Sequence, residues 1–320
     1  MFARAWTKTW IAGASLVALA AASTGAQAAG KDVSLVLGVK GSPFYDALAC
    51  GAKDEAKKLG LDLTVSAPDQ FAADSQIPVI DAVTARGPAA AVVVPTDTQA
   101  LIRPMAQLAK RGAKVLTVDQ TIADTSFIQT QIVTDNEQGG RLAADAMNEL
   151  LGGKGSVMMI TQPPGSAGQD ARAKGFEEEL KKYSGITYLG PQYQSDDPQK
   201  AAEIVTSALS AHPDLAGVFS TNDQGAIGGI TGLKQAAATG KVKFVAYDSA
   251  TAEVAAFKNG AISVLIAQNP KQEGEVAMQS VKRVLDGGKL EKTTLTEIAV
   301  IKPGENAKAD QYEYKGNCAQ

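Results

Sequence analysis

The stretch VSLVLGVKGSPFYDALACGAKDEAKKLG, residues 33–60, contains a complete strand-and-helix unit. Residues 33–37 are almost continuously apolar, which is typical of a strand covered on both faces of its sheet. Residues 43–59 carry their small and apolar side chains on one helical stripe, which predicts an amphipathic helix. Ser42 suits the N-cap of this helix and Gly60 its end.

The same alternation of strand and helix patterns continues along the chain. Helical patterns cover residues 137–151 and begin again at Asp197-Pro198. This alternation predicts a doubly wound parallel-sheet α/β architecture, and 320 residues suffice for two such domains. No low-complexity linker is present, so we expect one compact two-domain body. Further strands are expected at residues 91–94, 114–118, 156–160, 217–219, 243–247 and 263–266.

The composition argues against several classes of protein. Of the 320 residues, 45% are apolar and 20% are charged. This number of apolar residues is enough to form a packed core. The formal net charge of −3 provides no basic surface for nucleic acid. After residue 30, no stretch is apolar enough for long enough to span a bilayer.

Residues 1–28 have the three parts of a secretory signal peptide. Arg4 and Lys8 supply positive charge, residues 10–22 are a short apolar run, and Ala26-Gln27-Ala28 is a small-x-small cleavage site. A membrane anchor is the alternative, but the apolar run is short for one. We therefore expect export to the periplasm.

The chain has two cysteines, Cys50 and Cys318, and neither has the C-x-x-C spacing of redox or zinc sites. An oxidising compartment would permit a disulfide between them, which would hold the polar C-terminal segment in place. The alternative is a reduced thiol at Cys50, buried on the apolar stripe of the first helix.

Polar and aromatic side chains follow the predicted strands. In open parallel sheets, ligands bind beyond the carboxyl ends of the strands, so these side chains are candidates for a binding site. The segments concerned are 41–45, 95–97, Asp119-Gln120, 220–223, Asp248 and Gln268-Asn269.

This set of side chains suits a polyhydroxylated ligand. Planar carboxylate, carboxamide and guanidinium groups can each engage two neighbouring hydroxyls of a sugar. Phe44 and Tyr45 could pack against the C–H face of a sugar ring, although core packing is the alternative for both. For any single strand-end aspartate, the alternative is a helix N-cap.

No motif of a nucleophilic, zinc-dependent or dinucleotide-dependent enzyme is present. The only histidine, His212, lies at a predicted helix end, and residues 152–156 (GGKGS) lack the spacing of a phosphate loop. No D-x-D-x-D calcium loop occurs. We therefore expect a binding protein that is not an enzyme, without a cofactor or metal. A sugar-responsive transcription factor would need a helix-turn-helix where the signal peptide stands.

Eight short motifs occur in an order and spacing that resemble a known family. The chain is similar to the periplasmic sugar-binding proteins of ABC importers, particularly the ribose-binding-protein-like members, over nearly all of residues 31–303. The motifs are SPFY (42–45), VVPTD (93–97), TVDQ (117–120), TDNEQGGR (134–141), ARAKGF (171–176), STNDQGAIG (220–228), AYDS (246–249) and IAQNP (266–270).

The resemblance implies the type I periplasmic binding protein fold, with two similar domains joined by a three-crossover hinge. The crossovers are expected near Asp135-Asn136, near 268–270 and before 301–303. The N-terminal lobe would comprise residues 30–134 and 269–297. The C-terminal lobe and tail would comprise residues 135–268 and 298–320.

The resemblance also implies roles for individual residues. Phe44 and Tyr45 match stacking aromatics, Asp119 matches a carboxylate that accepts from sugar hydroxyls, and Arg172 matches an arginine of the second domain. A surface helix arginine is the alternative for Arg172. The full predicted ligand-binding set is Ser42, Phe44, Tyr45, Asp119, Gln120, Arg172, Asn222, Asp248 and Gln268.

Four departures leave the ligand open. Many relatives have asparagine at Ser42, and ribose binders have arginine at Gln120 and asparagine at Val94. They also have an aromatic residue where this chain has Ser195-Asp196-Asp197. Ribose is therefore not carried over: another pentose, a hexose or a linear sugar alcohol fits equally well.

The resemblance implies a monomeric solute-binding component that closes on its sugar or polyol and delivers it to the inner-membrane permease of an ABC transporter. The alternative is a sensing protein that presents its ligand to a chemoreceptor or signalling partner. Both would use the same closed form, so the sequence does not separate them.

Overall fold

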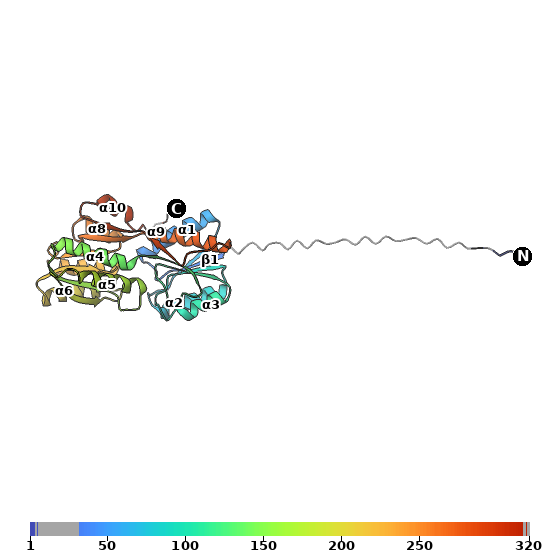
Figure 1. Ribbon diagram of the computed structural model, residues 1–320, viewed down its shortest axis with the longest axis horizontal. Coiled ribbons are helices and arrows are strands. Elements are labelled where there is room, and N and C mark those ends of the chain that lie inside the picture. Colours follow the sequence, from blue (N-terminus) through green and yellow to red (C-terminus); the bar gives the residue numbers. More distant parts are fainter. Residues whose placement is uncertain (4, 6–31, 316–317, 319–320) are drawn as a thin grey trace.

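The computed structural model describes residues 1–3, 5, 32–315 and 318. Most of the predicted signal peptide, residues 1–28, lies outside the described residues. The described chain forms two α/β bodies that lie side by side (Figure 1). Within the described ranges, no helix is long and apolar enough to cross a membrane.

The first body contains a six-stranded sheet in which every pair of neighbouring strands is parallel. Its strands, given across the sheet, are β11 (Thr293–Thr296), β5 (Ile128–Thr134), β4 (Lys114–Val118), β3 (Ala90–Val93), β1 (Asp32–Val36) and β2 (Asp62–Ser66).

The second body contains another six-stranded sheet, in which only the edge pair of β10 and β12 is antiparallel. Its strands, given across the sheet, are β12 (Ile298–Ile301), β10 (Val264–Gln268), β9 (Lys243–Tyr247), β8 (Leu215–Ser220), β6 (Gly155–Thr161) and β7 (Ile186–Tyr193). The predicted fold class, two doubly wound α/β domains, is confirmed.

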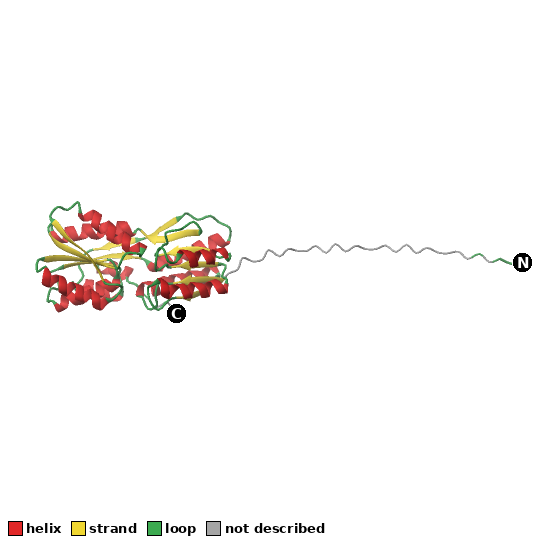
Figure 2. Cartoon of the chain, turned by 90° about the horizontal axis from the view of Figure 1, so that it is seen from below, coloured by secondary structure: helices red, strands yellow, loops and turns green. Residues whose placement is uncertain are grey.

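Helices cover both faces of each sheet, and Figure 2 shows them as layers on either side of the strands. The first sheet lies between α1 (Pro43–Leu59) with α9 (Pro270–Leu285) and α2 (Ala73–Arg86) with α3 (Ile102–Lys110). The second lies between α4 (Asn136–Leu151) with α5 (Ala167–Leu180) and α6 (Pro198–Ala211), α7 (Asp223–Gln235) and α8 (Thr251–Lys258). The last helix, α10 (Asn306–Tyr312), packs on α8 and β10.

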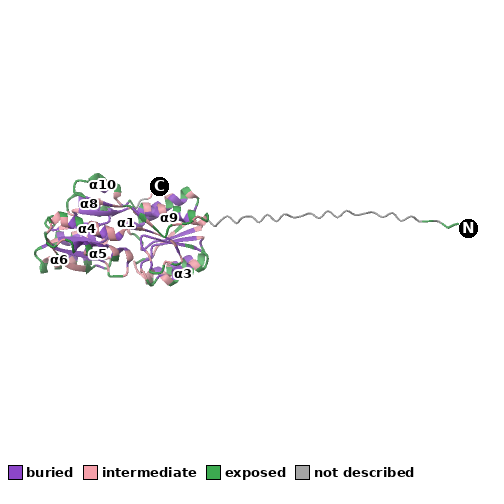
Figure 3. Ribbon diagram, viewed as in Figure 1, coloured by how far each residue is buried: buried purple, intermediate pink, exposed green. Residues whose placement is uncertain are grey.

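The central strands form the core of each body, coloured as buried in Figure 3. All four residues of β3 are buried, as are all five of β10. Burial of both faces explains why these strands read as continuous apolar runs in the sequence.

Glycines allow paired helices to pack closely. A Cβ atom at Gly274 of α9 would lie 2.1 Å from the backbone oxygen of Leu48 in α1, and one at Gly140 of α4 would lie 2.1 Å from that of Arg172 in α5. Only glycine fits such contacts without a shift of the backbone. These contacts set the positions of the helices that carry site residues.

The predicted ends of the first helix are only partly confirmed. Gly60 ends α1 in the left-handed conformation, with φ of 65°. Ser42 occupies the N-cap position, but its side chain makes no capping hydrogen bond. Ser42 is therefore the N-cap residue, as predicted, but without a side-chain cap, and it lines the cavity described below.

Between β1 and α10, the chain passes between the two sheets three times: between β5 and β6, between β10 and α9, and between β11 and β12. Glu273, fully buried in α9, connects these passages because its Oε1 accepts hydrogen bonds of 3.0 Å from Thr134 and Thr296. These threonines end β5 and β11, so one carboxyl side chain links all three passages.

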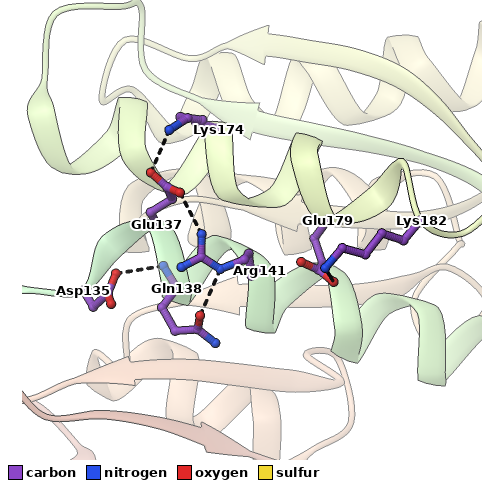
Figure 4. A network of polar contacts seen from close by, with 7 residues as sticks. All are labelled: Asp135, Glu137, Gln138, Arg141, Lys174, Glu179 and Lys182. Carbon is purple, nitrogen blue, oxygen red and sulfur yellow. Dashed lines mark hydrogen bonds and ion pairs between the residues drawn. The ribbon is translucent and has the colours of Figure 1, made fainter.

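A surface network joins α4 and α5 (Figure 4). Glu137 accepts from Arg141 Nη1 at 2.7 Å and from Lys174 Nζ at 2.9 Å. Arg141 also donates to Gln138 through Nε. The charged ends are partly exposed, so the pairs contribute little to stability.

The predicted disulfide is present, since the Sγ atoms of Cys50 and Cys318 are 2.04 Å apart. It joins α1 of the first body to the chain segment that follows α10 of the second. The alternative of a reduced thiol at Cys50 is therefore wrong.

Candidate functional site

A cavity of about 300 Å³ lies where strand ends and helix starts of the two bodies face each other. All nine residues of the predicted ligand-binding set line it. Further lining residues that the sequence did not single out as binding residues are Val39, Lys40, Gly41, Phe71, Gln162, Gln169, Asp196, Asp223 and Gln224.

The first turn of α1 supplies two aromatic rings. Phe44 and Tyr45 are each 7% exposed, and their ring centroids are 5.4 Å apart in an edge-to-face arrangement. Tyr45 also stacks on Phe71, at 6.4 Å. Core packing and a place in the binding site, the two alternatives for these rings, are therefore compatible. Both rings pack in the core and also line the cavity.

Asp119 follows β4 in a left-handed conformation, with φ of 63°. Its Oδ2 accepts from the hydroxyl of Tyr45 at 3.1 Å. Burial raises the pKa of Asp119 to about 6, although the nearby Arg172 guanidinium opposes the rise. The alternative of an N-cap does not hold for this aspartate, and its carboxylate lines the cavity.

Asp248 follows β9 and also has a positive φ, of 90°. Its Oδ1 accepts from Gln268 Nε2 at 2.7 Å and from the hydroxyl of Tyr314 at 2.8 Å. Its Oδ2 accepts from the backbone N–H of Asp223 at 3.2 Å. Three donors therefore fix this carboxylate at the cavity wall.

Arg172 of α5 is 2% exposed, so the surface-arginine alternative is wrong. Its Nε donates to Asn136 and its Nη1 to the carbonyl of Thr221, both at 2.8 Å. The guanidinium lies 3.8 Å from the centroid of the Tyr247 ring. Burial works against its charge, but Tyr247 and the carboxylates of Asp248 and Asp119 keep the pKa of Arg172 above its usual value.

Asn222 both caps α7 and lines the cavity. Its Oδ1 accepts from the backbone N–H of Gly225 at 3.0 Å and from Gln194 Nε2 at 3.0 Å. Its Nδ2 donates to Asp196 Oδ1 at 2.9 Å. The residue thus holds Asp196 against the cavity.

Gln120 connects the two bodies. Its Oε1 accepts from the backbone N–H of Gly168 at 2.7 Å and from Ser166 Oγ at 3.3 Å. A second contact of this kind is the hydrogen bond from the backbone N–H of Thr98 to the carbonyl of Gly165, at 3.2 Å. Gln120 follows β4 of the first body, whereas residues 165–168 precede or begin α5 of the second.

Asp196 and Asp223 are acidic lining residues outside the predicted ligand-binding set, although Asp223 belongs to the candidate segment 220–223. Asp196 stands in the segment 195–197, which was noted only for lacking an aromatic residue, and Asp223 follows the predicted Asn222. Burial and the neighbouring Asp248 raise the pKa of Asp223 to about 7. Burial also raises the pKa of Asp196. Acidic residues after a strand were the available signal for both.

The cavity offers hydrogen-bond acceptors and donors at short range on two facing walls. Carboxylates of both bodies can accept from hydroxyl groups, while Arg172, Asn222 and Gln268 carry donor groups. Across the described residues, no group of three or more histidine, cysteine or acidic side chains is arranged to hold a metal ion. The geometry suits binding of a small polar molecule with an apolar face.

Comparisons with known proteins agree with this geometry. The family model of the periplasmic binding protein domain matches residues 33–289. The ribose import binding protein RbsB of Salmonella typhimurium is 30% identical over 288 residues, 90% of this chain and 96% of that protein. The D-allose-binding periplasmic protein of Escherichia coli is 27% identical over 276 residues, 84% and 88% of the two chains.

A solved structure of similar fold is an ABC transporter solute-binding protein from Agrobacterium vitis bound with α-D-tagatopyranose. It has a TM-score of 0.87 and 32% identity, and covers 89% of this chain and 99% of its own. A carbohydrate transporter solute-binding protein from Agrobacterium radiobacter in complex with D-arabinose has a TM-score of 0.83 and 26% identity, covering 88% and 98%. The chain belongs to the periplasmic binding protein domain family.

Proposed function

We propose that this protein is the solute-binding component of an ABC importer and that it binds a monosaccharide or a sugar alcohol between its two lobes. The observation that carries the proposal is the single cavity on which polar and aromatic side chains of both bodies converge. The relatives named for ribose and allose import, and the neighbours bound with tagatopyranose and arabinose, support this class of ligand.

Binding is proposed to close the hinge between a lobe of residues 30–134 and 269–297 and a lobe of residues 135–268 and 298–320. Each lobe supplies part of the cavity, so a ligand satisfies all of its hydroxyls only when the lobes meet. This difference in contacts favours the closed state. The bonds of Gln120 to Gly168 and Ser166 would form in the same movement.

Each of the nine predicted residues is proposed to contact or frame the sugar. Phe44 and Tyr45 would cover its C–H face, while the carboxylates of Asp119 and Asp248 would accept from its hydroxyls. Arg172 would donate to a hydroxyl. The remaining polar members of the proposed set are Ser42, Gln120, Asn222 and Gln268.

Three of the four departures from ribose binders line the cavity, at Ser42, Gln120 and Asp196. The amide oxygen of Gln120 accepts from the opposite body, and Val94 is fully buried in the first core. Asp196, which adds a carboxylate, stands near the position of the missing aromatic wall. A pentose other than ribose, a hexose or an alditol is therefore the proposed ligand class.

The proposed activity is binding without chemical change of the ligand. The only histidine, His212, caps the C-terminal end of α6 and is exposed, away from the cavity lining. Export by the signal peptide would place the protein in the periplasm as a monomer. There the closed form would deliver the sugar to the membrane permease.

A thermal-shift panel tests this proposal. D-ribose, D-allose, D-apiose, D-tagatose, D-arabinose, D-fucose and the matching alditols are added to purified mature protein. A ligand at about 100 times its Kd stabilises the folded state by about 2.7 kcal/mol, which corresponds to a rise in Tm of roughly 4 °C for a chain of this size. Unchanged Tm with every compound would contradict the proposal.

A further inference from the structure

The chain after α10 crosses from the second body to the first. Ala309 of α10 is fully buried in the second core, and the backbone N–H of Tyr314 donates to the carbonyl of Ser249 after β9. Four residues later, Cys318 is bonded to Cys50 of α1 in the first body. The C-terminal segment is therefore a fourth, covalent connection between the bodies, in addition to the three hinge passages.

Tyr314 lies inside this crossing and reaches two residues of the cavity wall. The side chain is 3% exposed, and its hydroxyl donates to Asp248 Oδ1 at 2.8 Å. Its ring packs edge-to-face on Phe44, with centroids 5.5 Å apart. Tyr314 does not line the cavity itself, so it acts on the site only through these two neighbours.

We propose that Tyr314 is a positioning residue of the sugar site and that the Cys50–Cys318 disulfide holds it in place. This inference rests on the proposed function. Asp248 belongs to one body and Phe44 to the other, so a single side chain sets a carboxylate and an aromatic ring on opposite sides of the cleft. The tail is thus a structural part of the binding site.

The hydroxyl of Tyr314 constrains the direction from which the Asp248 carboxylate can accept further hydrogen bonds. Oδ1 is held by Gln268 and Tyr314 and Oδ2 by the N–H of Asp223, so the carboxylate has a fixed orientation at the cavity wall. Burial and the Asp248 carboxylate raise the pKa of Tyr314, so the hydroxyl remains a donor at any physiological pH.

The test compares Tyr314→Phe with the wild type, using the panel sugar that gives the largest thermal shift and isothermal titration of that sugar. Phenylalanine keeps the ring on Phe44 but removes the donor to Asp248. We expect sugar affinity to fall about 10-fold, since hydrogen bonds to charged groups are among the stronger ones. The matched control is Tyr312→Phe, whose hydroxyl donates to Glu297 at the surface and whose loss should leave affinity unchanged.

A double-mutant cycle tests whether the disulfide holds Tyr314 in place. The variant Cys50→Ser/Cys318→Ser should also bind more weakly, and Tyr314→Phe should add less than twofold in that background because the tail no longer holds the tyrosine. Full additivity of the two effects, or wild-type affinity in Tyr314→Phe with only a lower Tm, would overturn the inference while the proposed function stands.

A measurement without sugar separates the two proposals. Small-angle scattering of the sugar-free protein should give a larger radius of gyration for the serine variant than for the wild type, because one connection between the lobes is lost. Equal radii of gyration would refute the inference that the C-terminal segment holds the two lobes together. If no panel sugar binds the wild type, the proposed function fails, and the scattering result alone decides the role of the tail.

Discussion

Replacing Arg172 by methionine is expected to weaken sugar binding about 100-fold. A charge-assisted hydrogen bond contributes roughly 1.5–3 kcal/mol, and a dry, two-walled site preserves its full value. Methionine keeps much of the side-chain volume beside the Tyr247 ring, so the loss reports on the guanidinium rather than on a void. Titration calorimetry with the best sugar of the thermal-shift panel measures the effect.

The geometry explains why the effect should be large. Asn136 and the carbonyl of Thr221 hold two of the guanidinium nitrogens, while Tyr247 covers its face. The group therefore loses little conformational entropy when it donates to a sugar. Its removal also leaves the carboxylates of Asp119 and Asp248 without their buried cation, which raises the pKa of Asp119 further and favours its protonated form.

The matched control is Arg141→Met on the neighbouring helix. Arg141 is paired with Glu137 at the surface (Figure 4). It is not among the residues that line the cavity. Its loss should leave affinity within twofold of the wild type. Circular dichroism melts establish that both variants fold. If Arg172→Met folds and binds sugar as the wild type does, Arg172 has only a structural role.

The sequence predicted most of the central strands because both of their faces are buried. The predicted ranges 114–118 and 243–247 coincide with β4 and β9, since each is an apolar run of ordinary strand length. Five strands were not predicted: β2, β5, β7, β11 and β12. Four of them are edge strands with exposed or half-exposed residues, so their side chains carry no continuous apolar signal. The interior strand β5 alternates buried and half-exposed residues, so it also lacks a continuous apolar run.

The nine predicted residues all line the cavity because the order of the strands places the residues that follow them at one edge of each sheet. In a parallel sheet, residues that follow the strands gather at one edge, so Asp119 after β4 and Asp248 after β9 could each be placed at the ligand edge of its own sheet. That the two edges face each other followed only from the resemblance to two-lobed sugar-binding proteins. Tyr314 could not be found in this way. It reaches the site through the chain's final crossing, and nothing local in the sequence indicates that a tail tyrosine lies next to Asp248.

Ser42 shows the limit of a local sequence signal. Its residue type and its place before Pro43 predict an N-cap, yet the hydroxyl makes no such bond. Local preference is worth about 1 kcal/mol for a cap, which tertiary context can override. The residue lines the cavity, in agreement with its place in the predicted ligand-binding set.

Replacing Asp119 by asparagine is expected to weaken sugar binding by about 100-fold and, at the same time, to stabilise the sugar-free protein. Asparagine also tolerates the left-handed conformation of Asp119 better than alanine does, so the backbone is not strained. The amide retains one oxygen for the Tyr45 hydroxyl but loses the charge and the second acceptor that sugar hydroxyls would use.

The stability change follows from the raised pKa of Asp119. The unfolded chain releases this proton near pH 3.8, whereas the folded protein retains it to about pH 6. The stabilising contribution is therefore fully present below pH 3.8 and is lost as the pH rises to about 6, by about 3 kcal/mol at most. Asparagine carries no charge to desolvate, so the variant should exceed the wild type by about 1–3 kcal/mol at pH 7.5 and by less near pH 4.

The pH dependence of binding has the opposite sign. In the proposed complex, sugar hydroxyls donate to the Asp119 carboxylate, so wild-type affinity should decline as the pH falls through about 6, whereas the weaker affinity of Asp119→Asn should not show that decline. Calorimetric titrations and denaturant melts between pH 5 and 8 measure both quantities. Strong, pH-independent binding by Asp119→Asn would remove Asp119 from the sugar contacts. If the Asp119→Asn variant gains stability and loses affinity, the buried carboxylate of the wild type lowers stability and is retained because the ligand requires it.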